Sequence, residues 1–338
     1  MAAKARGQGK KGRPEGPRKK EALRGSHPDA TPRPGLRPLW VAGLVALVAA
    51  LGIWYALDWS TGEPISATEH APTAVRERDL ARAAEERGQE GNGEGEQTMT
   101  PAEGGPAIER LELEVVALYP HDDQAYTQGF LWHDGSVYES TGLKGRSSVR
   151  RWDLASGETL QETALSPDLF GEGLARVGDR LIQLTWTAGR ALVYDLATLE
   201  QVGEHAYAGQ GWGLCHDGAH LVMSDGSDVL LLRDPEGFEV VERVAVTLDG
   251  KPLANLNELE CHGGQVYANI YQTETIARID PATGRVTALI DASGLLEPEE
   301  ARRAEVLNGI AYRPEGGTFL LTGKLWPHVF EVRLVPAE

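Results

Sequence analysis

The sequence predicts an all-β fold: a five-bladed β-propeller closed by its own N-terminal strand, preceded by one transmembrane helix and a disordered linker. Three observations lead to this prediction. Residues 108–338 contain a repeated strand-pair pattern, an additional strand precedes the first repeat, and the composition changes sharply before residue 108. With 338 residues, 41% of them hydrophobic, the chain is long enough to bury a large core.

The first 57 residues divide into a basic tail and an apolar segment. Residues 1–38 carry eleven Lys or Arg and three Asp or Glu, whereas the rest of the chain carries 22 basic and 47 acidic side chains. Residues 39–57 (LWVAGLVALVAALGIWYAL) contain no charge, and their length is close to the ~20 residues that a helix needs to cross a bilayer. Trp40 lies at one end and Trp54 and Tyr55 at the other, as interfacial aromatic side chains do. We therefore predict a transmembrane anchor at 39–57 behind a cytoplasmic tail at 1–38.

The basic flank predicts the orientation of this anchor. Basic segments stay in the cytoplasm, which places the residues after 58 on the periplasmic side of the inner membrane. A cleaved signal peptide is the alternative, but its apolar region is usually ~7–15 residues long and precedes a small-residue cleavage site, which is not evident here. Residues 58–107 are rich in Gly, Glu and Pro, so we expect a flexible linker.

The acidic body and its two cysteines limit the classes of partner. A net charge of −17 opposes binding to nucleic acid, because phosphate groups would be repelled. Cys215 and Cys261 both fall on the exported side, where a disulfide is allowed, but the sequence does not show whether they pair. We expect a monomer that contacts the membrane through its single N-terminal helix.

Residues 108–338 repeat one pattern, in which an apolar run, a Gly- and Asp-containing turn and a second apolar run follow one another. It occurs five times, as TQGFLWHDGSVYEST from 127, GEGLARVGDRLIQLTW from 171, GWGLCHDGAHLVMSDG from 211, NELECHGGQVYANIY from 257 and LNGIAYRPEGGTFLLTGKLW from 307. The turn residues are those of tight β-hairpins, and a further strand pair follows each of the first four units. Four strands in each repeat of ~40–50 residues are typical of a propeller blade.

The fifth repeat is one strand short, because the chain ends soon after HVFEVRLV (328–335). The additional strand LELEVVAL (111–118) precedes the first repeat. If this strand pairs with the last one, the ring closes and no open edge is left between the first and last blades.

The residue that begins the innermost strand of each repeat is polar or aromatic, although strands favour β-branched side chains. These residues are Gln128, Glu172, Trp212, Asn257 and Asn308. The position fourteen residues later, or sixteen in the fifth repeat, holds Gly142, Trp186, Gly226, Tyr271 and Lys324. Since innermost strands surround the axis of a propeller, we expect both sets to form a ring at one mouth of the central channel, with Glu172 and Trp186 facing a pocket.

Ten motifs in register give the chain a family resemblance. They are YPHDDQAYTQGF, YESTGLKGRSSVRR, LFGEGLA, QLTW, GQGWGL, MSDGSDVL, NELE, VYANIY, LNGIAY and LTGKLWP. Over residues 115–333 the chain closely resembles the plant-type and bacterial glutaminyl-peptide cyclotransferases. The resemblance implies a five-bladed propeller that converts the N-terminal glutamine of peptides or proteins to pyroglutamate and releases ammonia.

The resemblance also implies a site. Carried over by motif, the site residues are Gln128, Glu172, Trp186, Trp212, Asn257 and Lys324, while Tyr271 stands where the family usually has Trp. Glu172 is the sole acid at the ring positions, so we expect it to shuttle the proton, with Asn257 and Lys324 as further catalytic residues. Gln128, Trp186, Trp212, Tyr271 and Asn308 are expected to bind the substrate.

No metal or other cofactor is expected, because neither HExxH nor a paired-His motif occurs in the chain. His121 lies in the PHDD loop at the entrance and is expected to line the site. Two other functions stay open at this point. One is a calcium-dependent propeller lactonase or hydrolase, in which Glu172, Asn257 and Asn308 would converge as oxygen ligands. The other is a non-catalytic exported propeller that binds peptides, which would release no ammonia from a Gln-initiated dipeptide.

Overall fold

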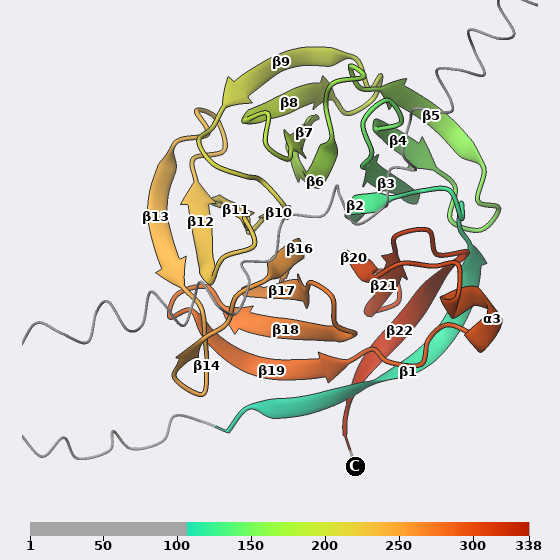
Figure 1. The fold of residues 1–338 in the computed structure, drawn as a ribbon, viewed down its shortest axis with the longest axis vertical. Coiled ribbons are helices and arrows are strands. Elements are labelled where there is room, and N and C mark those ends of the chain that lie inside the picture. Colours follow the sequence, from blue (N-terminus) through green and yellow to red (C-terminus); the bar gives the residue numbers. More distant parts are fainter. Residues whose placement is uncertain (1–106, 338) are drawn as a thin grey trace, which may run out of the picture. The chain divides into compact units, whose positions relative to one another are not determined.

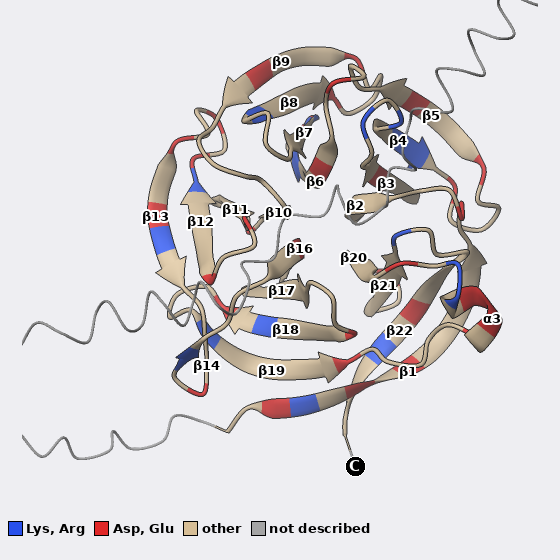
Figure 2. Ribbon diagram, viewed as in Figure 1, with Lys and Arg blue, Asp and Glu red and all other residues tan. Residues whose placement is uncertain are grey.

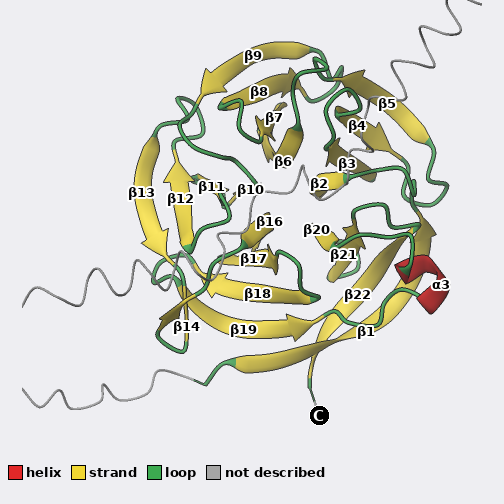
Figure 3. Cartoon of the chain, in the orientation of Figure 1, coloured by secondary structure: helices red, strands yellow, loops and turns green. Residues whose placement is uncertain are grey.

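The described part of the chain is built almost entirely of β-strands. The computed structural model describes residues 107–337, and within them the only helix is the short α3 (Pro298–Ala301) (Figure 3). The predicted all-β class is therefore confirmed for these residues. The predicted tail, the predicted span at 39–57 and the linker up to residue 106 lie outside them. Within 107–337, no helix combines the length and the apolar character that crossing a membrane requires.

Each of the five predicted repeats folds as a set of four hydrogen-bonded strands. The first set is β2 (Thr127–His133), β3 (Ser136–Thr141), β4 (Ser148–Trp152) and β5 (Thr159–Ala164). The second is β6 (Gly171–Val177), β7 (Arg180–Thr185), β8 (Arg190–Asp195) and β9 (Gln201–Ala206). The third is β10 (Leu214–His216), β11 (Leu221–Met223), β12 (Val229–Arg233) and β13 (Val240–Ala245).

The remaining strands belong to one larger sheet. The fourth set is β16 (Leu256–His262), β17 (Gln265–Ile270), β18 (Thr275–Asp280) and β19 (Arg285–Asp291). The fifth is β20 (Leu307–Arg313), β21 (Thr318–Gly323), β22 (His328–Pro336) and, from the start of the described chain, β1 (Glu109–Pro120). A small hairpin of β14 (Thr247–Leu248) and β15 (Lys251–Pro252) flanks β19.

The five sets lie around a common centre, in a β-propeller-like arrangement (Figure 1). The innermost strands are β2, β6, β10, β16 and β20, and the outermost strands run along the rim (Figure 1). Burial follows this order, because β6 is almost wholly buried whereas β9 and β13 are mostly exposed. Five hydrophobic clusters fill the spaces between neighbouring sets. One of them joins Phe130 of the first set to Leu320 of the fifth, so the packing closes the ring.

β1 supplies the strand that the fifth repeat lacks. It pairs antiparallel with β22 from Leu111↔Pro336 to Pro120↔His328, with one bulge between Val115 and Ala117. At its beginning it also pairs in parallel with β19, where Glu109 lies opposite Ala288. The predicted pairing of the N-terminal strand with the last strand is therefore observed, and β1 in addition ties the fourth set to the fifth.

The inner strands are irregular where the polar and aromatic residues were predicted to begin them. The pairing register shifts between Thr127 and Gly129, between Gly171 and Leu174, between Leu256 and Leu259 and between Leu307 and Ile310, and β10 begins only after Trp212. A bulge frees a residue from the regular ladder and redirects its side chain. These positions therefore do not need the β-branched side chains of an ordinary buried strand.

Glycines next to these bulges let neighbouring inner strands approach each other. A Cβ added to Gly213 would lie 2.0 Å from the carbonyl oxygen of Asn257, and one added to Gly173 would lie 2.5 Å from the backbone nitrogen of Leu214. No side chain fits at either position. Close by, Cys215 of β10 and Cys261 of β16 form a disulfide between the third and fourth sets, which the sequence had left open.

Candidate active site

The structure buries the five residues that precede or begin the inner strands. The exposed fractions are Gln128 4%, Glu172 5%, Trp212 7%, Asn257 3% and Asn308 0%. Lys324, which follows β21, is 3% exposed, whereas Trp186 after β7 and Tyr271 after β17 are half-buried. The predicted site residues are thus contributed by all five sets of strands.

Glu172 and Lys324 form an electrostatically coupled pair. Burial raises the pKa of Glu172 well above its usual 4.5, and the charge of Lys324 opposes this shift only in part. Burial lowers the pKa of Lys324 to about 8, against the opposing charges of Glu172 and Glu305. Within residues 107–337, neither the Glu172 carboxyl nor the Lys324 ammonium has a hydrogen-bond or ion-pair partner. Both groups are therefore free to act on a bound molecule.

Aromatic side chains surround this pair. Lys324 Nζ lies 4.8 Å from the ring centre of Tyr126 and 5.3 Å from that of Tyr271. On one side, Tyr271 meets Trp212 edge to face, with ring centres 5.6 Å apart. On the other side, the ring centres of Tyr126 and Phe170 lie 6.1 Å apart, and those of Phe170 and Trp186 lie 5.8 Å apart. These five rings form the aromatic wall of the site.

One amide side chain joins the two ends of this wall. The indole N–H groups of Trp186 and Trp212 both donate to Gln210 Oε1, at 2.7 and 3.1 Å. The contacts therefore run in a closed circuit through the aromatic residues, Lys324 and Gln210. Trp212 is also held by Gly226, because its indole packs so closely on this residue that an added Cβ would lie 2.6 Å from the ring.

Polar amides complete the site. Asn308 Nδ2 donates to the carbonyl oxygen of Thr127 at 2.9 Å and to Gln128 Oε1 at 3.1 Å. These bonds fix the orientation of the side-chain amides of Asn308 and Gln128. Asn308 Oδ1 is buried without a partner within the described residues. Asn257 is fixed through its backbone, whose carbonyl oxygen accepts from Ser224 Oγ at 2.7 Å. Within residues 107–337, the side-chain amide of Asn257 has no hydrogen-bond partner.

Comparisons with known proteins agree with this geometry. Residues 93–334 match the family described as glutamine cyclotransferase. The chain belongs to this family. It is also 40% identical over 233 residues to a glutaminyl-peptide cyclotransferase of Arabidopsis thaliana, covering 67% of this chain and 72% of that protein. The crystal structure of Myxococcus xanthus glutaminyl cyclase matches with a TM-score of 0.63 at 40% identity, covering 69% of this chain and 100% of the other. The resemblance found in the sequence is confirmed.

In this cyclotransferase-family chain, a buried ionic network adjoins the site at Thr127, the neighbour of Gln128. The Glu139 carboxylate accepts from Arg150 at 2.8 and 3.0 Å, from Trp152 Nε1 at 3.1 Å and from Thr127 Oγ1 at 2.7 Å. Although Glu139 is buried, the charges of Arg150 and His121 hold its pKa below the usual range. Since Thr127 precedes Gln128, the network positions a site residue.

His121 belongs to this network, so its side chain does not line the site as predicted. Its side chain is only 1% exposed, with Nε2 3.2 Å from Glu139 Oε1 and Nδ1 2.8 Å from the carbonyl oxygen of Trp326. The prediction was wrong because the His121 side chain points inward from a loop whose next three residues are exposed. There the carboxylate of Glu139 on β3 and the carbonyl oxygen of Trp326 both offer partners to the imidazole.

Four residues at the site were not predicted from the sequence. They are Tyr126, Phe170, Gln210 and Glu305. Glu305 is exposed and precedes β20. It is a second carboxylate close to Glu172 and Lys324, because its charge acts on Lys324, Tyr126 and Tyr271. Burial raises the pKa of Tyr126, and the charge of Glu305 raises it further. Their place in the sequence could have pointed to them, because each lies two or three residues before a predicted site residue.

One cavity adjoins the ring of site residues at Tyr126. This cavity of about 140 Å³ is lined by Tyr126 and Gly142 together with Arg146 and Arg150. Within the described residues, no three His, Cys, Asp or Glu side chains gather in a geometry that would hold a metal ion.

Proposed function

We propose that the chain is a glutaminyl-peptide cyclotransferase, which cyclises an N-terminal glutamine to pyroglutamate at the ring of Glu172, Lys324 and the aromatic side chains. One observation carries the proposal. The buried Glu172 carboxyl has no protein partner within residues 107–337 and lies near a buried lysine inside an aromatic wall. A carboxyl group in such surroundings titrates closer to neutral pH, as a proton-transfer group must.

The reaction needs one bond made, one broken and one proton moved. The substrate's own α-amine attacks the γ-amide carbon, the new C–N bond closes the five-membered lactam, and the bond to the amide nitrogen breaks. Glu172 accepts the proton that the attacking amine loses and returns it to the leaving nitrogen, which departs as ammonia. Because nucleophile and electrophile belong to one side chain, the enzyme contributes mainly by holding the folded rotamer.

Three donors are available for the oxygen of the γ-amide, which becomes negative as the amine attacks. They are Lys324 Nζ, the Asn257 amide and the Gln128 amide, whose Oε1 already accepts from Asn308. Fixed donors stabilise a developing oxyanion more strongly in a buried site than in water. Asn308 is a positioning residue in this scheme, because it orients Gln128 and the backbone of Thr127.

The aromatic wall serves to exclude water. Trp186, Trp212 and Tyr271 enclose the space next to Lys324, and the methylene groups of a glutamine side chain would fit against such rings. Water entering the same space would hydrolyse the amide to glutamate. Tyr271 replaces the tryptophan expected from the family pattern, so one part of this wall is smaller and carries a hydroxyl.

Ammonia release tests the proposal. The purified protein should release ammonia from a peptide that begins with glutamine and none from its N-acetylated counterpart, in which the attacking amine is blocked. We expect full activity after dialysis against EDTA or phenanthroline, because no step requires a metal. Loss of activity that one added metal restores would instead support the calcium-dependent hydrolase.

We also propose a cellular arrangement for this activity. The five sets of strands would form a five-bladed β-propeller that follows a transmembrane anchor at 39–57 and a flexible linker at 58–107. This would present a monomeric catalytic domain to peptides and proteins on the periplasmic side of the inner membrane. Protease added to intact spheroplasts should then remove the catalytic domain, and digestion only after lysis would contradict this orientation.

A further inference from the structure

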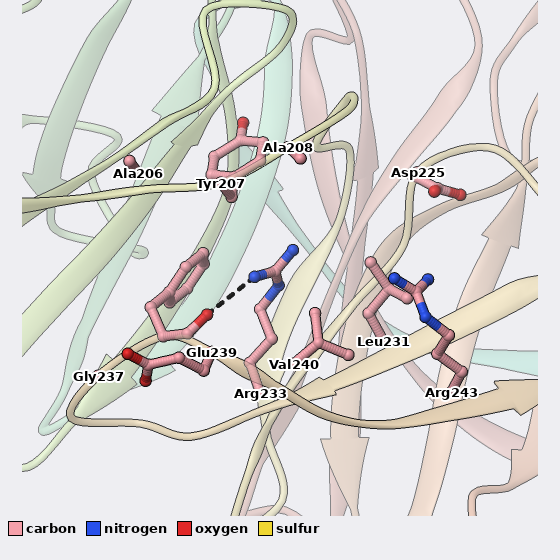
Figure 4. A pocket seen from close by; sticks show the side chains of 11 residues that line it. Ala206, Tyr207, Ala208, Asp225, Leu231, Arg233, Gly237, Glu239, Val240 and Arg243 are labelled. Carbon is pink, nitrogen blue, oxygen red and sulfur yellow. Dashed lines mark hydrogen bonds between the residues drawn. The ribbon is translucent and has the colours of Figure 1, made fainter.

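A cavity of about 290 Å³ lies between the second and third sets of strands, beside the proposed active site. Its lining comes from the segment after β9, from β12 and β13 and from the turn between them (Figure 4). Tyr207 is shared with the site, because its ring lines the cavity while its hydroxyl hydrogen-bonds the backbone of Thr185, the neighbour of Trp186. Asp225 also lines the cavity and precedes Gly226, against which Trp212 packs.

Arg233 is the unusual residue of this cavity. It is 4% exposed, yet it makes no ion pair within residues 107–337. Its Nη1 donates to the carbonyl oxygen of Phe238 at 2.8 Å and its Nε approaches Met223 Sδ at 3.1 Å, which uses two of five N–H groups. The guanidinium lies over the rings of Phe238 and Tyr207, at 4.7 and 5.7 Å. A buried cation normally has an anionic partner.

A second arginine faces the same space. Arg243 of β13 is exposed and makes no ion pair within the described residues, and its charge lowers the pKa of Arg233 further, after burial. β12 and β13 each carry one of these cations (Figure 2), and both guanidinium groups point toward the side of Tyr207 and Asp225 (Figure 4). Glu239 turns its carboxylate toward Gly237, away from them (Figure 4).

We propose that this cavity binds a carboxylate of the peptide substrate, downstream of the N-terminal glutamine, through Arg233 and Arg243. Arginine forks match the two oxygens of a carboxylate. Leu231, Val240 and Phe238 line the cavity as well, which suits an organic acid with an apolar stem. Two arginines and the carboxylate of Asp225 leave one positive charge in the cavity, which a singly charged carboxylate balances better than a phosphate dianion does.

The shared wall favours the substrate as the source of this carboxylate. A peptide whose first residue lies against Trp212 needs only a few residues, at ~3.3–3.6 Å each, to pass Asp225 and reach the cavity. The identity of the peptide rests on the proposed function, whereas the chemistry of the cavity does not.

Binding to the full chain in detergent tests the proposal without turnover. We would titrate the Glu172→Gln protein with Gln-initiated, C-terminally amidated tetrapeptides that carry Glu or Gln at one later position. At one position the acidic peptide should bind at least about tenfold more tightly than its neutral isostere, because charged hydrogen bonds contribute this much. Arg233→Met should remove that preference and Arg243→Gln should reduce it. Arg333→Gln, an exposed arginine on β22, should leave it unchanged.

Two results would overturn the proposal. One is equal binding of acidic and neutral peptides at every position, and the other is a preference that persists in both arginine variants. If Arg233→Met does not fold, the exposed Arg243→Gln variant still decides. Equal peptide binding, with glutarate raising the thermal stability of wild type but not of the arginine variants, would assign the cavity to a free acid instead. Ammonia release by wild type is measured in parallel, so arginine-dependent binding without any turnover would contradict only the cyclotransferase function.

Discussion

Burial shifts the pKa values of Glu172 and Lys324 toward neutrality from opposite directions. The carboxyl group loses hydration and becomes easier to protonate, while the ammonium group loses hydration and becomes easier to deprotonate. Neither has a protein partner within residues 107–337 that would restore its ordinary value. A site with a proton acceptor and a cation of this kind suits a reaction in which an amine loses a proton and an amide oxygen gains negative charge.

The pH dependence of kcat/KM should report Lys324. Its pKa of about 8 means that the ammonium is lost as the pH rises through that value, so kcat/KM should fall on the alkaline side. Lys324→Arg keeps its charge to much higher pH, so its alkaline fall should move upward by more than one pH unit. Lys324→Met should lose at least ~10²-fold in kcat/KM, in the range seen when an oxyanion donor is removed.

The matched measurement uses one peptide substrate for all three proteins, because the α-amine of the substrate itself titrates near ~7.7–8.0. That titration raises the rate with pH in each protein alike. An alkaline limb at the same pH in wild type and Lys324→Arg would show that Lys324 is not the group that titrates.

At the level of single elements, the inner strands are irregular near the site residue and come close to the neighbouring inner strand. In four of the five sets a glycine follows the site residue, at positions 129, 173, 213 and 309, while the fourth set has Glu258. The Glu258 carboxyl accepts backbone N–H groups of Phe130 at 3.2 Å and Ile310 at 2.9 Å, and so links three inner strands. Burial raises the pKa of Glu258 well above 4.5, and the charge of Glu260 adds to this shift.

The disulfide between β10 and β16 should stabilise the two sets of strands that carry Trp212 and Asn257. It closes a loop with a sequence separation of 46 residues, for which chain entropy predicts about 3–4 kcal/mol. We expect the Cys215→Ala, Cys261→Ala double variant to lose roughly this amount in denaturant unfolding. Reductant should lower the unfolding midpoint of wild type and leave that of the double variant unchanged. An equal response of both proteins to reductant would contradict the assignment.

The strands and the ring residues could be predicted because each depends on local sequence. The hairpin turns, the alternating apolar runs and the polar starts at Glu172 and Asn257 repeat along the chain, and the repeat supplies the geometry. Gln210 and Glu305 could not be predicted in this way, because they act through contacts between different sets of strands. His121 was predicted to line the site because of its loop, and only the fold reveals that its side chain points inward to Glu139.

On the scale of the whole molecule, the site exists only when the ring is closed. Its residues come from all five sets of strands, and Lys324 of the fifth set lies among residues of the first and fourth. β1 secures this closure by pairing with both β22 and β19. Loss of the closure would therefore displace the residues of the site as well as lower the stability of the protein.

Removing β1 should weaken the whole ring. A chain that begins at residue 121 lacks β1, exposes the edge of β22 and loses the buried side chain of Leu111, whose burial alone contributes ~1.5–3 kcal/mol. Compared with a chain that begins at residue 98, it should be less stable by about 3 kcal/mol or more and should release little ammonia. Equal unfolding midpoints for the two chains would show that β1 does not close the ring.

Glu172 is the central residue of the proposed reaction, and one variant measured in two ways tests its role. Glu172→Gln keeps the size of the side chain but removes its titrating proton, so ammonia release should fall by at least ~10²-fold. The raised pKa makes the native state bind the proton more tightly than the unfolded state. Wild type therefore loses stability as the pH rises from 4.5 through the raised value. The variant should match wild type near pH 4 and be more stable at neutral pH. A folded variant that releases ammonia within a few-fold of the wild-type rate would contradict the central claim, as would one that is less stable at neutral pH.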